Sequence, residues 1–132
     1  MGQQQLIIVI LSAILIGIAI TVGLFWFQSA RIQSNKDALI EDLLNIQANA
    51  RAYYNKPSSL GGGNRSYAKY IIPSRLRSNE NGSYRLDGVP LSTTVKFQAF
   101  SADDSTNWIK AMLDISTQKL VFTSYGGDFD DN

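Results

Sequence analysis

The chain has 132 residues, of which 12 are basic and 11 acidic, for a formal net charge of +1, and it contains no cysteine and no histidine. Without histidine, the serine–histidine and cysteine–histidine nucleophile systems and histidine-ligated metal sites are excluded, so we expect no enzymatic activity and no cofactor. Without cysteine, no disulfide stabilises the fold.

The first element in the chain is an apolar segment of 22 residues, from Leu6 to Phe27, which contains neither a charge nor a proline. This length is sufficient to span a bilayer as a helix. The five residues before it are polar and uncharged, whereas a secretory signal peptide begins with basic residues. We therefore expect a retained helix rather than a cleaved signal peptide.

The charges that flank this segment bear on its orientation. Arg31 and Lys36 both follow it, and the positive-inside tendency places the side with more basic residues in the cytoplasm. Two explanations stay open: the chain is an exception to this tendency, or a basic leader is removed by processing.

Small residues inside the apolar segment predict helix–helix contact. Ala13 and Gly17 are four residues apart, as are Ala19 and Gly23, and such pairs let helix backbones approach closely. The residues that we expect to pack against neighbouring copies are Leu6, Ile10, Ala13, Gly17, Ala19 and Gly23.

The apolar segment continues without a break into an amphipathic one. Apolar side chains recur at helical spacing and predict one buried stripe; they are Leu39, Leu43, Ile46, Ala50 and Tyr53. Pro57 is the first proline, and the residue before a proline disfavours helical geometry. We therefore expect one helix to about Asn55, roughly 80 Å long at 1.5 Å per residue.

A glycine-rich region follows the predicted helix. Gly61–Gly63 lacks the lysine and serine or threonine that complete a phosphate-binding loop, so a mobile connector is expected. Tyr67–Ile72 fits either a short helix or a strand, and the sequence does not decide between them.

The last part of the chain is typical of an antiparallel sheet, because runs rich in β-branched and aromatic residues alternate with turn residues. The predicted strands are Ser83–Val89, Thr94–Ala102, Trp108–Ile115 and Lys119–Tyr125. An acidic tail follows from Gly126, whose Asp128, Asp130 and Asp131 offer either a solvated end or oxygen ligands for calcium.

Together these patterns predict an α+β fold in which a long N-terminal helix packs against a small antiparallel sheet. The predicted regions are the apolar half of the helix in residues 1–30, its amphipathic half in 31–56, a connecting loop in 57–82, and the sheet with its acidic tail in 83–132.

Charge is distributed unevenly along the chain. Residues 65–96 hold six basic against two acidic groups, a balance of +4, and residues 97–132 hold two basic against six acidic groups, a balance of −4. This pattern fits either scattered surface charge or complementarity between copies of the chain.

The basic residues between positions 65 and 96 are also interleaved with tyrosines, a pattern found in nucleic-acid-binding surfaces. The residues concerned are Arg65, Lys69, Arg75, Arg77, Arg85 and Lys96, with Tyr67, Tyr70 and Tyr84 between them. Core tyrosines beside solvated basic residues give the same pattern, so nucleic acid is the less favoured partner.

The whole layout resembles the type IV pilins and the pseudopilins of type II secretion. The features that carry the resemblance are the apolar start at Leu6, the continuous helix to about Asn55, the loop at Gly61–Gly63 and the sheet after Ser83. It implies that subunits leave the inner membrane and form an extracellular helical filament, with their apolar helices at its centre. It further implies a pilus assembly machinery as partner.

The resemblance also assigns roles to the first residues. Family members are cut after a glycine, which places possible processing at Gly2. A glutamate near the mature N-terminus usually pairs with a neighbouring subunit; Gln3, Gln4 and Gln5 occupy that region here and are the candidates for setting helix register.

The sequence therefore predicts a structural subunit of an extracellular filament that polymerises with identical copies through its apolar helix. One alternative is a single-pass membrane protein with a small extracytoplasmic binding domain. A second is a filament of the same architecture that also captures DNA.

Overall fold

A computed structural model describes residues 2–130 of the chain. The chain divides into two compact units, Met1–Gln33 and Ser34–Asn132, and we call the second unit the head. One helix, α1 (Gly2–Asn55), forms the described part of the first unit and the first element of the head. The predicted helix to about Asn55 is confirmed, and Pro57 follows its end with φ of −65°.

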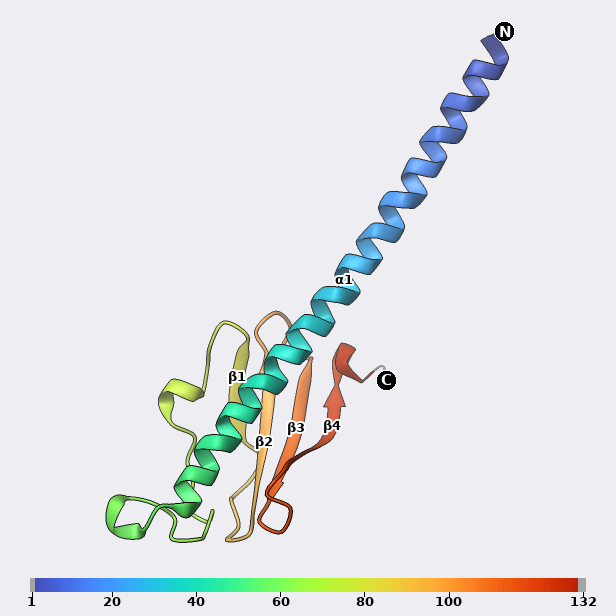
Figure 1. The fold of residues 1–132 in the computed structure, drawn as a ribbon. Helices are drawn as coiled ribbons and strands as arrows, with labels where there is room; N and C mark the ends of the chain where they lie inside the picture. The colour runs from blue at the N-terminus through green and yellow to red at the C-terminus, as the bar shows by residue number, and fades with distance from the viewer. Residues whose placement is uncertain (1, 131–132) are drawn as a thin grey trace. The chain divides into compact units, whose positions relative to one another are not determined.

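The head contains one antiparallel sheet, a meander in the order β1-β2-β3-β4 (Figure 1). Its strands are β1 (Gly82–Leu86), β2 (Thr94–Ser101), β3 (Trp108–Asp114) and β4 (Leu120–Gly126). The predicted α+β fold is confirmed, and the four predicted strands are present with small shifts at their ends.

One face of the sheet packs against the head's part of α1. Alternate residues of β2 and β3 point to this side because successive side chains of a strand face opposite ways. Val95, Phe97 and Ala99 are buried, as are their partners across the strands, among them Leu113 and Ile109. The register between β3 and β4 shifts after Lys110, so that Ala111 pairs with Phe122.

The region between α1 and β1 is ordered by hydrogen bonds to the end of the helix. The backbone N–H groups of Gly63 and Arg65 donate to the carbonyls of Tyr53 and Tyr54 at 2.8 Å each. These carbonyls lie in the last turn of α1, where helical partners are missing. The glycine-rich region is therefore the C-terminal cap of α1, and the expectation of a mobile connector does not describe it.

Gly62 and Gly63 are required by close approach in this cap. A Cβ at Gly63 would lie 2.0 Å from the Ser66 carbonyl oxygen and 2.6 Å from a ring carbon of Tyr53. A Cβ at Gly62 would lie 2.1 Å from the carbonyl oxygen of Lys56.

Residues 67–72 form neither the helix nor the strand that the sequence left open. They are irregular, with a turn closed by the N–H of Tyr70 donating to the carbonyl of Tyr67. Tyr67, Tyr70 and Ile72 nevertheless belong to the core. The ring of Tyr70 meets Phe97 edge to face, with centroids 6.3 Å apart, so this segment fills the space between α1 and the sheet.

The end of the described chain also differs from the predicted acidic tail. Gly127–Phe129 forms a short 3₁₀ helix, and the side chain of Phe129 is only 2 % exposed. The Nζ of Lys36 donates to the Phe129 carbonyl at 3.0 Å. An apolar side chain inside the acidic run anchors it to the core, and Asp131 lies outside the described residues.

Candidate functional site

The first unit presents an apolar surface that no other described residue of this unit covers. Sixteen large apolar side chains between Leu6 and Phe27 are 48–76 % exposed, the least being Val22 and the most Trp26. A continuous surface of this kind marks contact with lipid or protein. The predicted packing residues all lie on it, including Leu6, Ile10 and the four small ones.

The hydroxyl groups in this segment bond back onto the helix. Ser12 Oγ donates to the Ile8 carbonyl at 2.7 Å, and Thr21 Oγ1 donates to the Gly17 carbonyl at 2.9 Å. A polar group left without a partner in an apolar medium is costly. These two bonds make both hydroxyls compatible with a lipid or protein interior.

The glycines of the segment are not required by the fold of the chain itself. A Cβ added at Gly17 or Gly23 would meet nothing within 4 Å. Glycine within a helix destabilises it by about 1 kcal/mol relative to alanine. The two positions therefore weaken the isolated helix without any compensating contact inside the described chain.

The small residues lie on two different faces of α1. At about 100° per residue, Ala13 and Gly17 lie about 40° apart. Ser12, Ala19 and Gly23 share a second face, roughly 120° around the helix from the first. Each face allows close approach of another helix, so the segment offers two such surfaces.

The predicted register residues lie in the first turn of α1. Gln3, Gln4 and Gln5 are exposed there, together with Gly2, and the turn contains no acidic residue. A helix N-terminus favours a negative charge nearby. The glutamines can supply hydrogen bonds at this end of the helix but no charge.

The predicted helix–head residues lie at the contact between α1 and the sheet. Leu39, Leu43, Ile46 and Ala50 are at most 1 % exposed. Tyr53 is half-buried, and its ring meets Tyr70 edge to face with centroids 5.4 Å apart.

A polar anchor that the sequence did not reveal lies beside this stripe. Asp42 Oδ2 accepts three hydrogen bonds from the segment that leads into the sheet: Asn79 Nδ2 and Asn81 Nδ2 donate at 2.8 Å each, and the Tyr84 hydroxyl at 2.5 Å. Burial raises the pKa of Asp42, but the three donors together outweigh it, and the pKa is lower than its ordinary value of 3.8. The only signal in the sequence was an acidic residue beside the apolar stripe.

A depression of about 350 Å³ opens next to this anchor. Its walls combine donors and acceptors, and the polar residues among them are Asp42, Asn45, Asn49, Arg75, Asn79 and Tyr84. Asn49 Oδ1 is already engaged by the Tyr70 hydroxyl at 2.9 Å. Such a wall suits a small polar molecule, and this depression is a candidate binding site of the head.

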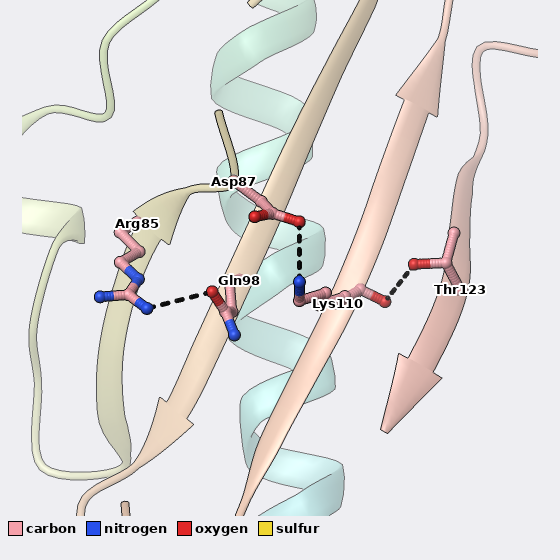
Figure 2. Close-up of polar contacts among 5 residues, drawn as sticks. All are labelled: Arg85, Asp87, Gln98, Lys110 and Thr123. Carbon is pink, nitrogen blue, oxygen red and sulfur yellow. Dashed lines mark hydrogen bonds and ion pairs between the residues drawn. The ribbon is translucent and has the colours of Figure 1, made fainter. Parts of the chain in front are cut away.

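The face of the sheet opposite α1 carries linked polar groups, which Figure 2 shows across all four strands. Arg85 Nη2 donates to Gln98 Oε1 at 3.2 Å, and Lys110 Nζ lies 3.2 Å from Asp87 Oδ2. The Arg85 guanidinium also lies 4.3 Å from the ring centroid of Phe100. These groups satisfy one another, and surface pairs of this kind contribute little to stability.

The three tyrosines that suggested a nucleic-acid-binding surface are buried in the structure. Tyr67, Tyr70 and Tyr84 are at most 4 % exposed, so none can stack on a base. The core interpretation of these tyrosines is correct.

Within residues 2–130, no group of three His, Cys, Asp or Glu side chains is placed to hold a metal ion. The structure therefore shows no ligand cluster for the calcium site that the sequence left open. Asp128 instead contacts Asn107: its Oδ2 accepts from Asn107 Nδ2 at 3.3 Å, and its N–H donates to Asn107 Oδ1 at 2.7 Å.

α1 is long and apolar enough to cross a membrane, and a signal sequence near an N-terminus meets the same criteria. Comparisons with protein-family models, with curated proteins and with solved structures found no significant match to this chain.

Proposed function

We propose that the chain is the structural subunit of an extracellular helical filament, held in the membrane by the apolar part of α1 before assembly and polymerising through that same surface afterwards. The observation that carries the proposal is the pair of small-residue faces on the helical segment Leu6–Phe27, whose large apolar side chains are exposed throughout.

The energetics of assembly give these faces their importance. Lipid tails are as apolar as leucine, so moving the helix from lipid to a protein neighbour yields little hydrophobic gain. Association then depends on close packing. Gly17 and Gly23 leave open space where a neighbouring helix can approach, and the loss of helix propensity at these positions is offset by that contact.

The number of faces favours a polymer over a dimer. A two-fold dimer uses one surface patch twice, whereas contacts through two different patches extend into a ring or an open filament. Two faces roughly 120° apart around the helix suit a helix surrounded by several neighbours. Within the head, the burial of Leu39, Leu43, Ile46 and Ala50 and the bonds of Asp42 hold the second part of α1 against the sheet.

Electron microscopy of material sheared from cells that express the full chain tests the proposal. We expect fibres that contain this chain. Gly17→Leu and Gly23→Leu should abolish fibres while the protein still fractionates with membranes, because the added side chains block close approach but keep the segment apolar. Ile18→Leu, which preserves size in the same segment, is the matched control and should leave fibres intact.

The result that would overturn the proposal is a wild-type chain that stays in the membrane as a detergent-soluble monomer. That outcome would favour the alternative, a single-pass membrane protein with an extracytoplasmic binding head. The polar depression beside Asp42 is the observation that supports this second function. Saturable binding of a small polar ligand, weakened by Asn45→Ala on its wall, would then be expected.

A further inference from the structure

The head has a basic end and an acidic end, separated along α1. The acidic end consists of exposed carboxylates on three loops, and its residues are Glu80, Asp104, Asp128 and Asp130. The basic end consists of exposed cationic side chains around the end of α1, and its residues are Arg51, Lys56, Arg65, Lys69 and Lys119.

Hydrogen bonds place the loops of the acidic end together at the start of the head's helix. The Asn81 carbonyl accepts from Asn35 Nδ2 at 3.3 Å and from the N–H of Ala102 at 2.9 Å. Lys36 Nζ, bound to the Phe129 carbonyl, brings the third loop to the same place. This lysine also lies 4.4 Å from the ring centroid of the half-buried Tyr125, so its ammonium group is engaged by a backbone carbonyl and an aromatic ring of its own subunit.

Other contacts gather the basic end at the opposite end of the head. Arg51 Nη2 donates to Gln118 Oε1 at 3.2 Å, which holds the β3–β4 turn, with Lys119, beside the last turns of the helix. The cap of α1 brings Arg65 to Tyr54. In Figure 1 the capping loop and the β3–β4 turn lie together at the end of the head where α1 stops. Asp114 is the nearby carboxylate, and it accepts bonds from Ser116.

The distance between the two ends lets each act on its own. Asn35 and Arg51 are 16 residues apart in α1, so the ends are separated by about 24 Å at 1.5 Å per residue. The Debye length at physiological ionic strength is about 8 Å. The ends therefore do not neutralise one another within one subunit, and each is available to a second molecule.

We propose that the basic end of one head docks on the acidic end of the next copy of the chain, and that this contact sets the polarity and axial register of the filament. The inference rests on the proposed function. A second copy is the occupant that the charges favour, because every subunit carries both a basic and an acidic end. A contact between two different patches is heterologous and propagates into an open polymer, and opposite charge steers association and fixes register.

Charge-reversed full-length chains test this docking. Glu80→Lys/Asp128→Lys/Asp130→Lys makes both ends basic, and Lys56→Glu/Lys69→Glu/Lys119→Glu makes both ends acidic. We expect each variant alone to lose at least about tenfold of the polymer that sediments after detergent removal. Mixed in equal amounts, the two should copolymerise, because every contact then joins a basic end to an acidic end. Arg75→Glu/Lys96→Glu also lowers the net charge, by four against six in the second variant, but leaves both ends unchanged, so it should polymerise normally.

Ionic strength supplies a second measurement. Raising it from about 0.01 M to about 1 M shortens the Debye length from about 30 Å to about 3 Å, and wild-type polymer should decrease while fibres already formed lose axial order. If the wild type polymerises and neither charge reversal has an effect, or if the control variant loses as much polymer, the docking contact is wrong. The proposed filament is not affected by that result. Failure of the wild type to polymerise at all overturns the filament itself. Copolymerisation of the two reversed variants supports the docking, since a folding defect could not be rescued by mixing. Recovery of either variant by a polyanion or a vesicle instead of its counterpart would show that the end binds a different partner.

Discussion

The hydroxyl of Tyr84 donates a hydrogen bond of 2.5 Å to Asp42 Oδ2, joining the first strand of the sheet to the middle of α1. Tyr84 is 4 % exposed, and it lines the depression that opens beside Asp42. The pair is the most buried part of the anchor that ties the irregular segment before β1 to the helix.

Removing this hydroxyl should destabilise the head. For Tyr84→Phe we expect a loss of about 1.5–3 kcal/mol in the free energy of unfolding, the range for hydrogen bonds to charged groups. Denaturant unfolding in detergent micelles measures it. Tyr125→Phe is the control, because the contacts of Tyr125 are made by its ring. In a double-mutant cycle with Asp42→Asn, strictly additive losses would contradict a direct interaction.

The same anchor predicts sensitivity to acid. The folded-state pKa of Asp42 lies below 3.8, so the unfolded state binds more protons and stability rises with pH. The contribution is fully present above pH 3.8 and is lost as pH falls through the lower folded-state value. Thermal unfolding followed by circular dichroism from pH 6 to about pH 2 should show a decrease that Asp42→Asn reduces. The exposed Glu41→Gln should not reduce it.

Alkaline pH should act through the buried tyrosines. Burial raises the pKa of Tyr70 from 10.0 to about 12 and also raises the pKa of Tyr84. Since these pKa values are higher in the folded state, their contribution to stability is present below pH 10 and is lost as pH rises through about 12. Tyrosinate absorbance should appear together with the loss of β-sheet signal. Ionisation of all six tyrosines near pH 10 in a folded head would be inconsistent with this burial.

Phe129 should contribute far more to stability than a residue in an acidic tail. Its side chain is 2 % exposed, and truncating a buried phenylalanine to alanine costs about 3–5 kcal/mol. Phe129→Ala should lower the melting temperature clearly. Val89→Ala, at a side chain that is 85 % exposed, should change stability by about 0.5 kcal/mol at most. Equal effects of the two substitutions would mean that residues 127–129 do not pack on the core.

Gly63→Ala tests the cap of α1. The added Cβ would meet the Ser66 carbonyl oxygen at 2.0 Å, and such overpacking typically costs about 1–3 kcal/mol. Amide hydrogen exchange should show faster opening of the last turn of α1. Gly23→Ala, where a Cβ meets nothing within 4 Å, is the control and should leave exchange in the head unchanged. Unaltered protection in Gly63→Ala would indicate that the glycine-rich region is not a cap.

The elements that depend on local patterning could be predicted from the amino-acid order alone. Apolar residues at helical spacing and Pro57 defined α1 (Gly2–Asn55), and alternation such as Val95, Phe97 and Ala99 defined the strands. Short connections imposed the antiparallel order. Each of these signals arises within about ten residues of chain, where side-chain periodicity directly reflects backbone geometry.

The remaining features arise from contacts between residues far apart in the chain, and these only the tertiary structure decided. Asp42 meets Tyr84 from 42 positions away, and Lys36 meets Phe129 from 93. The sequence showed an excess of basic and then of acidic residues, but which of them share an end of the head depends on how loops return to α1. Local periodicity carries no information about such pairings, because they are set by sheet register and by the packing of irregular segments against the core.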